Sequence, residues 1–183
     1  MSNIAMQGGA TGTGTVTLLA PSTSTNRILT LPDATGTVAL QGGAGVGKVL
    51  QVVNANYSTA VSNSTLTYAD TGLTASITPT STSSKILVFV NQADVIKSIN
   101  DTSCRIQLQR NGALIVQFAL FAAGTGTTAI NVNSGVSTTY LDSPATTSSV
   151  TYKTQFASTG NNASVSVQFG NSTSTITLME IAA

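Results

Sequence analysis

The fold class is decided by the stretch Cys104-Arg105-Ile106-Gln107-Leu108-Gln109-Arg110-Asn111-Gly112-Ala113-Leu114-Ile115-Val116. From Cys104 to Gln109 apolar side chains alternate with polar ones, which is the pattern of a strand with one buried face. A second apolar run begins at Ala113. Asn111-Gly112 stands between the two runs and predicts a type I′ turn, because that turn needs φ > 0 at both central positions. We therefore expect a β-hairpin here.

Similar apolar runs recur at close spacing between clusters of Gly, Asn, Ser and Pro. The predicted strands cover residues 48–54, 66–69, 73–78, 85–95, 104–110, 113–121, 136–141, 150–156, 163–169 and 175–181. Such spacing is typical of an all-β, antiparallel sandwich or barrel, and we expect a jelly-roll-like β-sandwich across residues 48–183. The composition agrees, since 53 of 183 residues are Ser or Thr and only one is Glu. No helix longer than two turns is expected.

Three of these runs carry further expectations. Residues 85–90 are apolar on both faces, which predicts a central strand covered on each side, with the outer cover supplied by another subunit. Residues 150–156 and 163–169 both follow a period of two and flank Gly160-Asn161-Asn162, which predicts a second hairpin.

The chain divides into residues 1–47 and residues 48–183. The first segment holds nine of the sixteen glycines, and Gly-Thr-Val-Thr-Leu at 14–18 returns as Gly-Thr-Val-Ala-Leu at 36–40. Each copy predicts a short strand with too few apolar side chains to form a core alone. We expect an extended, β-rich attachment arm that joins the jelly-roll domain through the glycine-rich hinge 42–47.

The charges exclude several classes of function. Seven Lys and Arg against six Asp and Glu give a net charge of +1, so neither nucleic acid nor an anionic membrane is an expected partner. The sequence has no His, which removes His-based catalysis and His metal sites. Cys104 is the single cysteine and is expected to be a buried thiol. Residues 1–14 lack the pattern of a signal peptide, and no apolar stretch reaches the ~20 residues that span a bilayer.

One motif imitates a nucleotide site. Gly42-Gly43-Ala44-Gly45-Val46-Gly47-Lys48 fits the spacing of a phosphate-binding loop, but Val49 stands where Ser or Thr must bind Mg²⁺. A strand rather than a helix is predicted to follow, so the run is interpreted as a linker and no cofactor is expected.

Paired carboxylates are the remaining acid–base chemistry, and six are available: Asp33, Asp70, Asp94, Asp101, Asp142 and Glu180. Three of them, Asp33, Asp70 and Asp142, stand in turn-like contexts, which explains them without catalysis. Asp94 and Asp101 with Asn91 and Asn100 lack the spacing of a calcium loop, so solvated loop residues are favoured over a metal site. We expect no catalytic residue and no enzyme activity.

Four tyrosines are candidates for a sugar-stacking surface: Tyr57, Tyr68, Tyr140 and Tyr152. Tyr152 alternates with core positions and is expected to be packed, whereas Tyr140 ends a predicted strand and is the better exposed candidate. Carbohydrate at the loop tips is thus a candidate partner.

The sequence resembles virion proteins of tailed phages, especially cyanophages. The fibre-like repeats at 14–21 and 26–40 carry this resemblance, together with Lys-Val-Leu-Gln-Val-Val at 48–53, Asp-Thr-Gly-Leu at 70–73, Ser-Thr-Ser-Ser-Lys-Ile-Leu-Val at 81–88 and Ile-Thr-Leu-Met-Glu-Ile at 176–181. Similar domains are trimeric jelly rolls of the tumour-necrosis-factor type, so the resemblance implies a homotrimer.

The resemblance implies a structural protein located in the virion and assembled in the host cytoplasm. The expected function is a capsid decoration, or cement, protein whose arm binds the major capsid protein or other virion proteins. The alternative is a short tail fibre or receptor-binding tip that contacts host-surface glycans. Only 47 residues precede the predicted sandwich, whereas long fibres carry a large attachment domain, so decoration is favoured.

Overall fold

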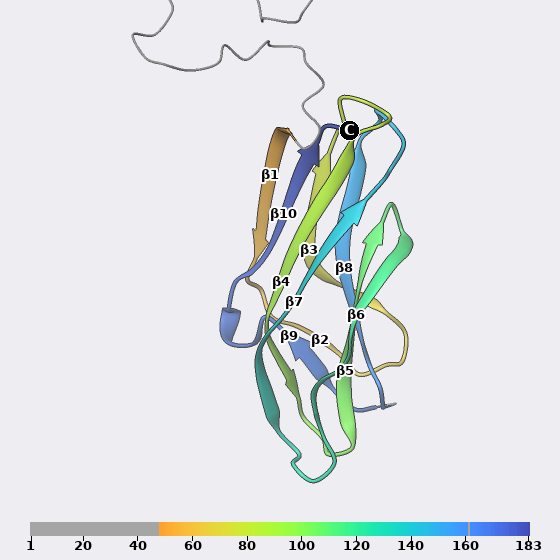
Figure 1. Cartoon of the computed structure of the whole chain (residues 1–183). Coiled ribbons are helices and arrows are strands. Elements are labelled where there is room, and N and C mark those ends of the chain that lie inside the picture. The colour runs from red at the N-terminus through yellow and green to blue at the C-terminus, as the bar shows by residue number, and fades with distance from the viewer. Residues whose placement is uncertain (1–47, 161) are drawn as a thin grey trace, which may run out of the picture. The chain divides into compact units, whose positions relative to one another are not determined.

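A computed structural model describes residues 48–160 and 162–183 (Figure 1). The predicted arm 1–47, with its repeats and its glycine hinge, lies outside these described residues. The described residues form ten strands and a single turn of 3₁₀ helix, η1: β1 (Val49–Tyr57), β2 (Val61–Asn63), β3 (Ala69–Ile77), β4 (Lys85–Lys97), β5 (Thr102–Arg110), β6 (Ala113–Thr125), β7 (Asn131–Asp142), β8 (Val150–Ser158), β9 (Val165–Val167), η1 (Phe169–Asn171) and β10 (Ser174–Ile181).

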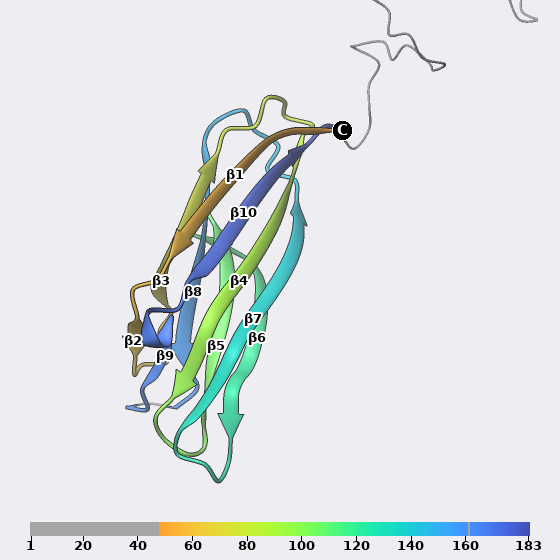
Figure 2. The same ribbon diagram turned by 90° about the vertical axis from the view of Figure 1, so that its left-hand side faces the viewer.

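The strands make two antiparallel sheets that pack face to face (Figure 2). In the first, called the β4 sheet, β4 pairs with β7 on one side and with β10 on the other, and β1 continues beyond β10. The short strands β9 and β2 extend this sheet. The second, called the β8 sheet, has the order β3-β8-β5-β6. The predicted all-β sandwich is confirmed, and this alternation of strands between two sheets is the jelly-roll arrangement.

The hairpin predicted at Asn111-Gly112 is present between β5 and β6. Asn111 has φ 49° and Gly112 has φ 85°, as a type I′ turn requires. β6 has 13 residues and pairs with nine in β5, so four extra residues must be accommodated. The ladder does so through four register shifts, which are bulges or irregularities of β6 against β5.

The second predicted hairpin is wrong. β8 pairs with β3 and β5 in one sheet, whereas β9 pairs with β2 and β4 in the other. Both strands bury one face against the same core, so each shows a period of two although the two never pair. A period of two therefore identifies a half-buried strand without identifying its partner.

The strand predicted at residues 66–69 is also largely wrong, because β2 lies earlier and β3 begins at Ala69. The Asn63 side chain donates to the carbonyl of Thr67 at 2.9 Å and accepts from the amide of Thr65 at 2.9 Å. These side-chain bonds satisfy the backbone locally, so residues between Asn63 and Thr67 have no need of a ladder partner.

The core has two apolar clusters with polar groups between them. One cluster centres on Ile86, Val88 and Tyr152, and the other contains Cys104, Ile106 and Phe156. Between them, the Thr154 hydroxyl donates to Gln92 Oε1 at 3.0 Å. The Gln92 amide in turn donates to Ser174 at 2.8 Å, and all three side chains are buried. This polar chain joins the two sheets through the middle of the sandwich.

The domain has two distinct ends. The amide of Ala182 donates to the carbonyl of Lys48 at 2.9 Å, so β1 begins beside the end of β10. Lys85 pairs with Ile181 at this same end, and β4 runs from there for 13 residues, about 40 Å, to the opposite end. The connections β4–β5 and β6–β7 lie at that opposite end (Figure 1).

Candidate interaction surface

Four apolar side chains form a row across the outer face of the β4 sheet, one from each main strand. Val52 pairs with Met179, Met179 with Leu87, and Leu87 with Leu141. Their neighbours along the strands, such as Ile86 and Val88, point inward and are fully buried. Since side chains alternate between faces, the row points away from the core. We call these four residues the apolar row.

The apolar row is accessible in the single chain. Val52 is 56% exposed and Leu141 is 52% exposed, while Leu87 and Met179 are half-buried. Phe89, two residues beyond Leu87 on the same face, is 39% exposed. The prediction that β4 is central and apolar on both faces is therefore confirmed. Its outer cover is not supplied by the described part of this chain, and cover by another subunit stays a prediction.

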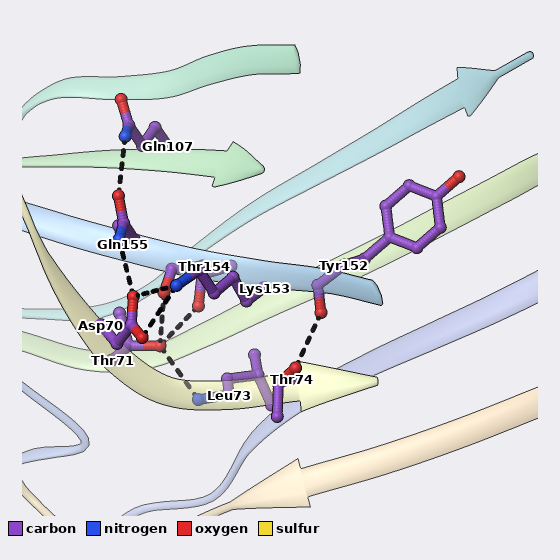
Figure 3. A network of polar contacts seen from close by, with 9 residues as sticks. All are labelled: Asp70, Thr71, Leu73, Thr74, Gln107, Tyr152, Lys153, Thr154 and Gln155. Atoms are coloured by element: carbon purple, nitrogen blue, oxygen red, sulfur yellow. Dashed lines mark hydrogen bonds and ion pairs between the residues drawn. The ribbon is translucent and has the colours of Figure 1, made fainter. Parts of the chain in front are cut away.

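The outer face of the β8 sheet is polar instead (Figure 3). Asp70 forms an ion pair with Lys153 at 2.8 Å and accepts a hydrogen bond from Gln155 at 2.6 Å. Gln155 accepts in turn from Gln107 at 3.1 Å. Partial burial opposes ionisation of Asp70, but the hydrogen bonds from Lys153 and Gln155 outweigh it and lower the pKa of this carboxyl. These side chains satisfy one another across three strands.

Asp142 is a structural carboxylate rather than a turn residue. It ends β7, and both its oxygens lie within 2.8 Å of Arg110 Nη1. The Tyr152 hydroxyl donates to Asp142 Oδ2 at 2.7 Å. Burial, followed by this bond to a carboxylate, raises the pKa of Tyr152. The turn interpretation is wrong for Asp70 as well, because Asp70 lies within β3; Asp33 lies outside the described residues.

Glu180 lies near the end of β10, and its side chain is fully buried. Its Oε1 accepts from the Thr80 amide and hydroxyl, each at 2.7 Å, and its Oε2 accepts from Gln51 Nε2 at 2.6 Å. Burial opposes the charge, yet these hydrogen bonds prevail and lower the pKa of Glu180 to about 2. The ionised carboxylate thus attaches the β3–β4 connection to β10.

The four tyrosines do not form one sugar-stacking surface. Tyr152 is fully buried, as predicted. Tyr140 is half-buried and so more exposed than Tyr152, as predicted, but it pairs with Val88 and packs against the first core cluster rather than at a loop tip. Tyr57 packs against the same cluster, and Tyr68 lies under the Arg105 guanidinium at 5.4 Å.

Cys104 is a free thiol with no exposed surface, as predicted. Burial raises its pKa to about 12, and the neighbouring Arg105 only partly offsets this effect. Since the thiolate is the reactive form, Cys104 is a packing residue rather than a nucleophile.

The prediction that Asp94 and Asp101 are solvated loop residues is confirmed for Asp101 and wrong for Asp94. Asp94 lies within β4 with φ 36°, and Asp101 lies in the β4–β5 connection with φ 53°. Among residues 48–160 and 162–183, no three Asp, Glu, Cys or His side chains gather closely enough to hold a metal ion.

Two of the surface hollows have an acidic residue in their lining. The larger, of about 380 Å³, lies at the end opposite Lys48 and is lined by Asp101, Thr102, Ser103, Phe121, Gly124, Thr125, Gly126 and Thr159. Phe121 in this hollow is 74% exposed, more than any other large apolar residue described. The smaller, of about 270 Å³, is lined by Asp70, Gly72, Leu73, Thr74 and Lys153. Its carboxylate is already engaged by Lys153 and Gln155.

Sequence reasoning missed two features of this surface. The apolar row becomes visible only when the register of its four strands is known, and the sequence pattern indicated only its β4 residue, Leu87. Phe121 was interpreted as the last residue of an apolar strand, and nothing in its local pattern marks the shifts of register that expose it.

No protein-family model matches the sequence, and a search of curated proteins finds no significant match. In the part of the chain that the structure describes, no helix has the length and apolar character needed to cross a membrane.

Proposed function

We propose that this chain is a homotrimeric structural protein of a tailed-phage virion, acting as a capsid decoration protein. The observation that carries the self-association is the apolar row on one outer face of a sandwich whose other outer face is polar. Removing a Val or Leu side chain from water contributes roughly 1.5–3 kcal/mol, so covering the row with a second copy is favourable.

A closed ring of three copies is supported by the presence of apolar side chains at a second place. Leu114 and Leu120 on the edge strand β6 are 56% and 53% exposed. A ring needs two different complementary patches on each copy, whereas a two-fold dimer needs one patch that faces itself. With the row as one patch and the β6 edge as the other, three copies cover both. The resemblance to trimeric jelly rolls points to the same number.

The decoration role rests on the resemblance to virion proteins and on the two-ended shape of the domain. Residues 1–47 precede Lys48 in sequence, and Lys48 lies at the end of the domain where β10 finishes. Attachment through these residues would leave the loops of the opposite end directed outward. No catalytic role is proposed, because Asp70, Asp142 and Glu180 are engaged in structural hydrogen bonds.

The alternative, a short tail fibre or receptor-binding tip, is favoured by one observation. The larger hollow, with exposed Phe121, lies at the end that would meet a host surface. Both candidates share the same trimer and differ only in where the trimer is attached.

Electron microscopy of purified virions with a gold-labelled antibody against this chain tests the location. Gold over heads supports decoration, and gold at the tail tip supports the alternative. An absence of gold from particles that are intact and accessible to a control antibody against the shell would contradict both. In a second measurement, full-length protein is added to heads that lack it. We expect saturable binding, and variants lacking residues 2–47 should lose it.

A further inference from the structure

The larger hollow is built by an irregular stretch of β6. Between Thr102 and Cys104 the ladder partners move from Thr125 to Ala122, and between Cys104 and Ile106 they move from Ala122 to Ala119. Each step advances β6 by three residues for two in β5, so a one-residue bulge lies on either side of Ala122, and Phe121 lies within the second bulge. Bulges redirect side chains, and they commonly do so at functional sites. The result is an aromatic ring held outside the core.

The backbone around the hollow is also unusual. Asp101 and Ala123 have φ 53° and 55°, in the left-handed region that costs a non-glycine residue free energy. A Cβ added at Gly124 would approach the carbonyl oxygen of Phe121 to 3.0 Å. A Cβ added at Gly126 would lie 3.3 Å from Asp101 Oδ1. Because Gly124 and Gly126 have no side chains, the space beside Phe121 and Asp101 stays open.

The polar lining consists of hydroxyls and one carboxylate. No ion pair among residues 48–160 and 162–183 engages Asp101. Ser103 Oγ and Thr159 Oγ1 lie 3.1 Å apart, and the Thr159 hydroxyl also approaches the carbonyl of Ser103 at 3.2 Å. Each hydroxyl has two acceptor lone pairs, so this pair keeps capacity for a further donor. An ionised carboxylate accepts from several donors at once.

The negative charge in the lining of the hollow favours neutral hydroxyl-rich ligands over acidic ones. Asp101 is its charged lining residue, and no Lys or Arg lines it. Lys97 donates to the carbonyl of the lining residue Thr125 from behind the wall, and its side chain is fully buried and does not itself line the hollow. An acidic ligand would face the Asp101 carboxylate with no cation in the lining to bind it directly, whereas a neutral ligand with adjacent hydroxyls would donate to Asp101.

From these observations we propose that the hollow binds a neutral pyranose unit of a polysaccharide or glycan. The apolar C–H face of the sugar packs on Phe121, and sugar hydroxyls donate to Asp101 and to the Ser103–Thr159 pair. The volume of about 380 Å³ lies at the lower end of the range for small-ligand sites, about 300–1,000 Å³, and suits one sugar unit. The proposal goes beyond the virion role, since it holds whether the trimer decorates the head or the tail.

Saturation-transfer difference NMR on the full-length chain tests this proposal. The probes are the methyl glycosides of glucose, galactose, mannose and N-acetylglucosamine, with methyl glucuronide as the acidic comparison. We expect at least one neutral glycoside to receive saturation on ring C–H protons, with a Kd on the order of 1–10 mM, as suits a single sugar in an open site. Glucuronide should bind at least about tenfold more weakly.

Variants assign the signal to the hollow. Phe121→Ala and Asp101→Asn should each weaken binding at least about tenfold. Phe169→Ala is the matched control, because Phe169 is 48% exposed and lies in η1 outside the hollow; it should leave binding unchanged. Circular dichroism melting confirms that each variant is folded.

The proposal is overturned if no neutral glycoside gives a signal at 50-fold its expected Kd. It is equally overturned if the signal survives both Phe121→Ala and Asp101→Asn, or if glucuronide is preferred. These outcomes are independent of the proposed virion location, because gold labelling on heads or tails does not depend on sugar binding.

Discussion

The two outer faces of the sandwich differ although both belong to the same kind of antiparallel sheet. On the β8 sheet, Asp70, Gln155 and Gln107 form a chain of hydrogen bonds across three strands. On the β4 sheet, the corresponding cross-strand positions at the Lys48 end hold the apolar row. A polar face whose groups satisfy one another is suited to water. A face with four apolar side chains in one line is suited to contact with another protein surface.

The largest effect is expected from a charge placed in the apolar row. Leu141→Lys should raise the dissociation constant of the proposed trimer at least about 100-fold, because an ammonium would be buried where the proposed interface removes a Leu side chain from water. Leu141 is 52% exposed on the edge strand β7, so the single chain should still fold. Sedimentation velocity over a range of concentrations measures the shift.

The matched control is Ser76→Lys. Ser76 is exposed on the opposite outer face, where its hydroxyl lies 2.8 Å from that of Thr151. The same charge on this face should change the dissociation constant less than about twofold. If Ser76→Lys dissociates the protein and Leu141→Lys does not, the assignment of the two faces is reversed.

The second prediction concerns the contact between the two sheets of one chain rather than the contact between subunits. Asp142→Asn should lower the free energy of unfolding by about 2–3 kcal/mol, because Arg110 and Tyr152 lose a buried ionised partner. The estimate allows for the Arg110 side chain being 31% exposed. Urea unfolding at fixed protein concentration measures this free energy. A decrease below about 0.5 kcal/mol would show that the contact of Asp142 with Arg110 and Tyr152 does not hold the two sheets together.

The third prediction concerns acid and Glu180, which follows the apolar-row residue Met179 in β10 and points inward. The pKa of Glu180 in the folded chain is lowered to about 2 from an ordinary value of 4.5. Its contribution to stability is therefore fully present above about pH 4.5 and is lost as the pH falls toward 2. The melting temperature should fall over this window more steeply in the wild type than in Glu180→Gln. Parallel pH profiles for the two proteins would contradict the assigned role of Glu180.

The smallest effect belongs to the polar face. Lys153→Met removes the ion pair with Asp70, whose side chain is 55% exposed. Exposed ion pairs contribute roughly 0–1 kcal/mol, so unfolding should change by less than 1 kcal/mol and the trimer should not change. A loss above 2 kcal/mol in urea unfolding would mean that the polar face carries more of the stability than its exposure suggests.

The sequence predicted elements whose signals are local. The Asn111-Gly112 turn, the central strand β4 and the burial of Cys104 each follow from a few consecutive residues, and all three are confirmed. Pairing between distant segments is different. β8 and β9 share a period of two but enter opposite sheets, because the period reports burial and not partnership.

The candidate sites illustrate the same limit. The apolar row joins Val52, Leu87, Leu141 and Met179, which only the register of four strands brings into line. The hollow depends on bulges beside Phe121, and these arise because β6 is longer than the strand it pairs with. Neither feature has a motif of its own in the sequence.

The molar mass of the full-length chain in solution tests the role of the apolar face most directly. Light scattering coupled to size exclusion at low micromolar concentration should give about 55 kDa, three times the chain mass of 18.5 kDa. A mass of 18.5 kDa at that concentration would contradict the account, because the apolar row would then remain exposed to water in the free protein.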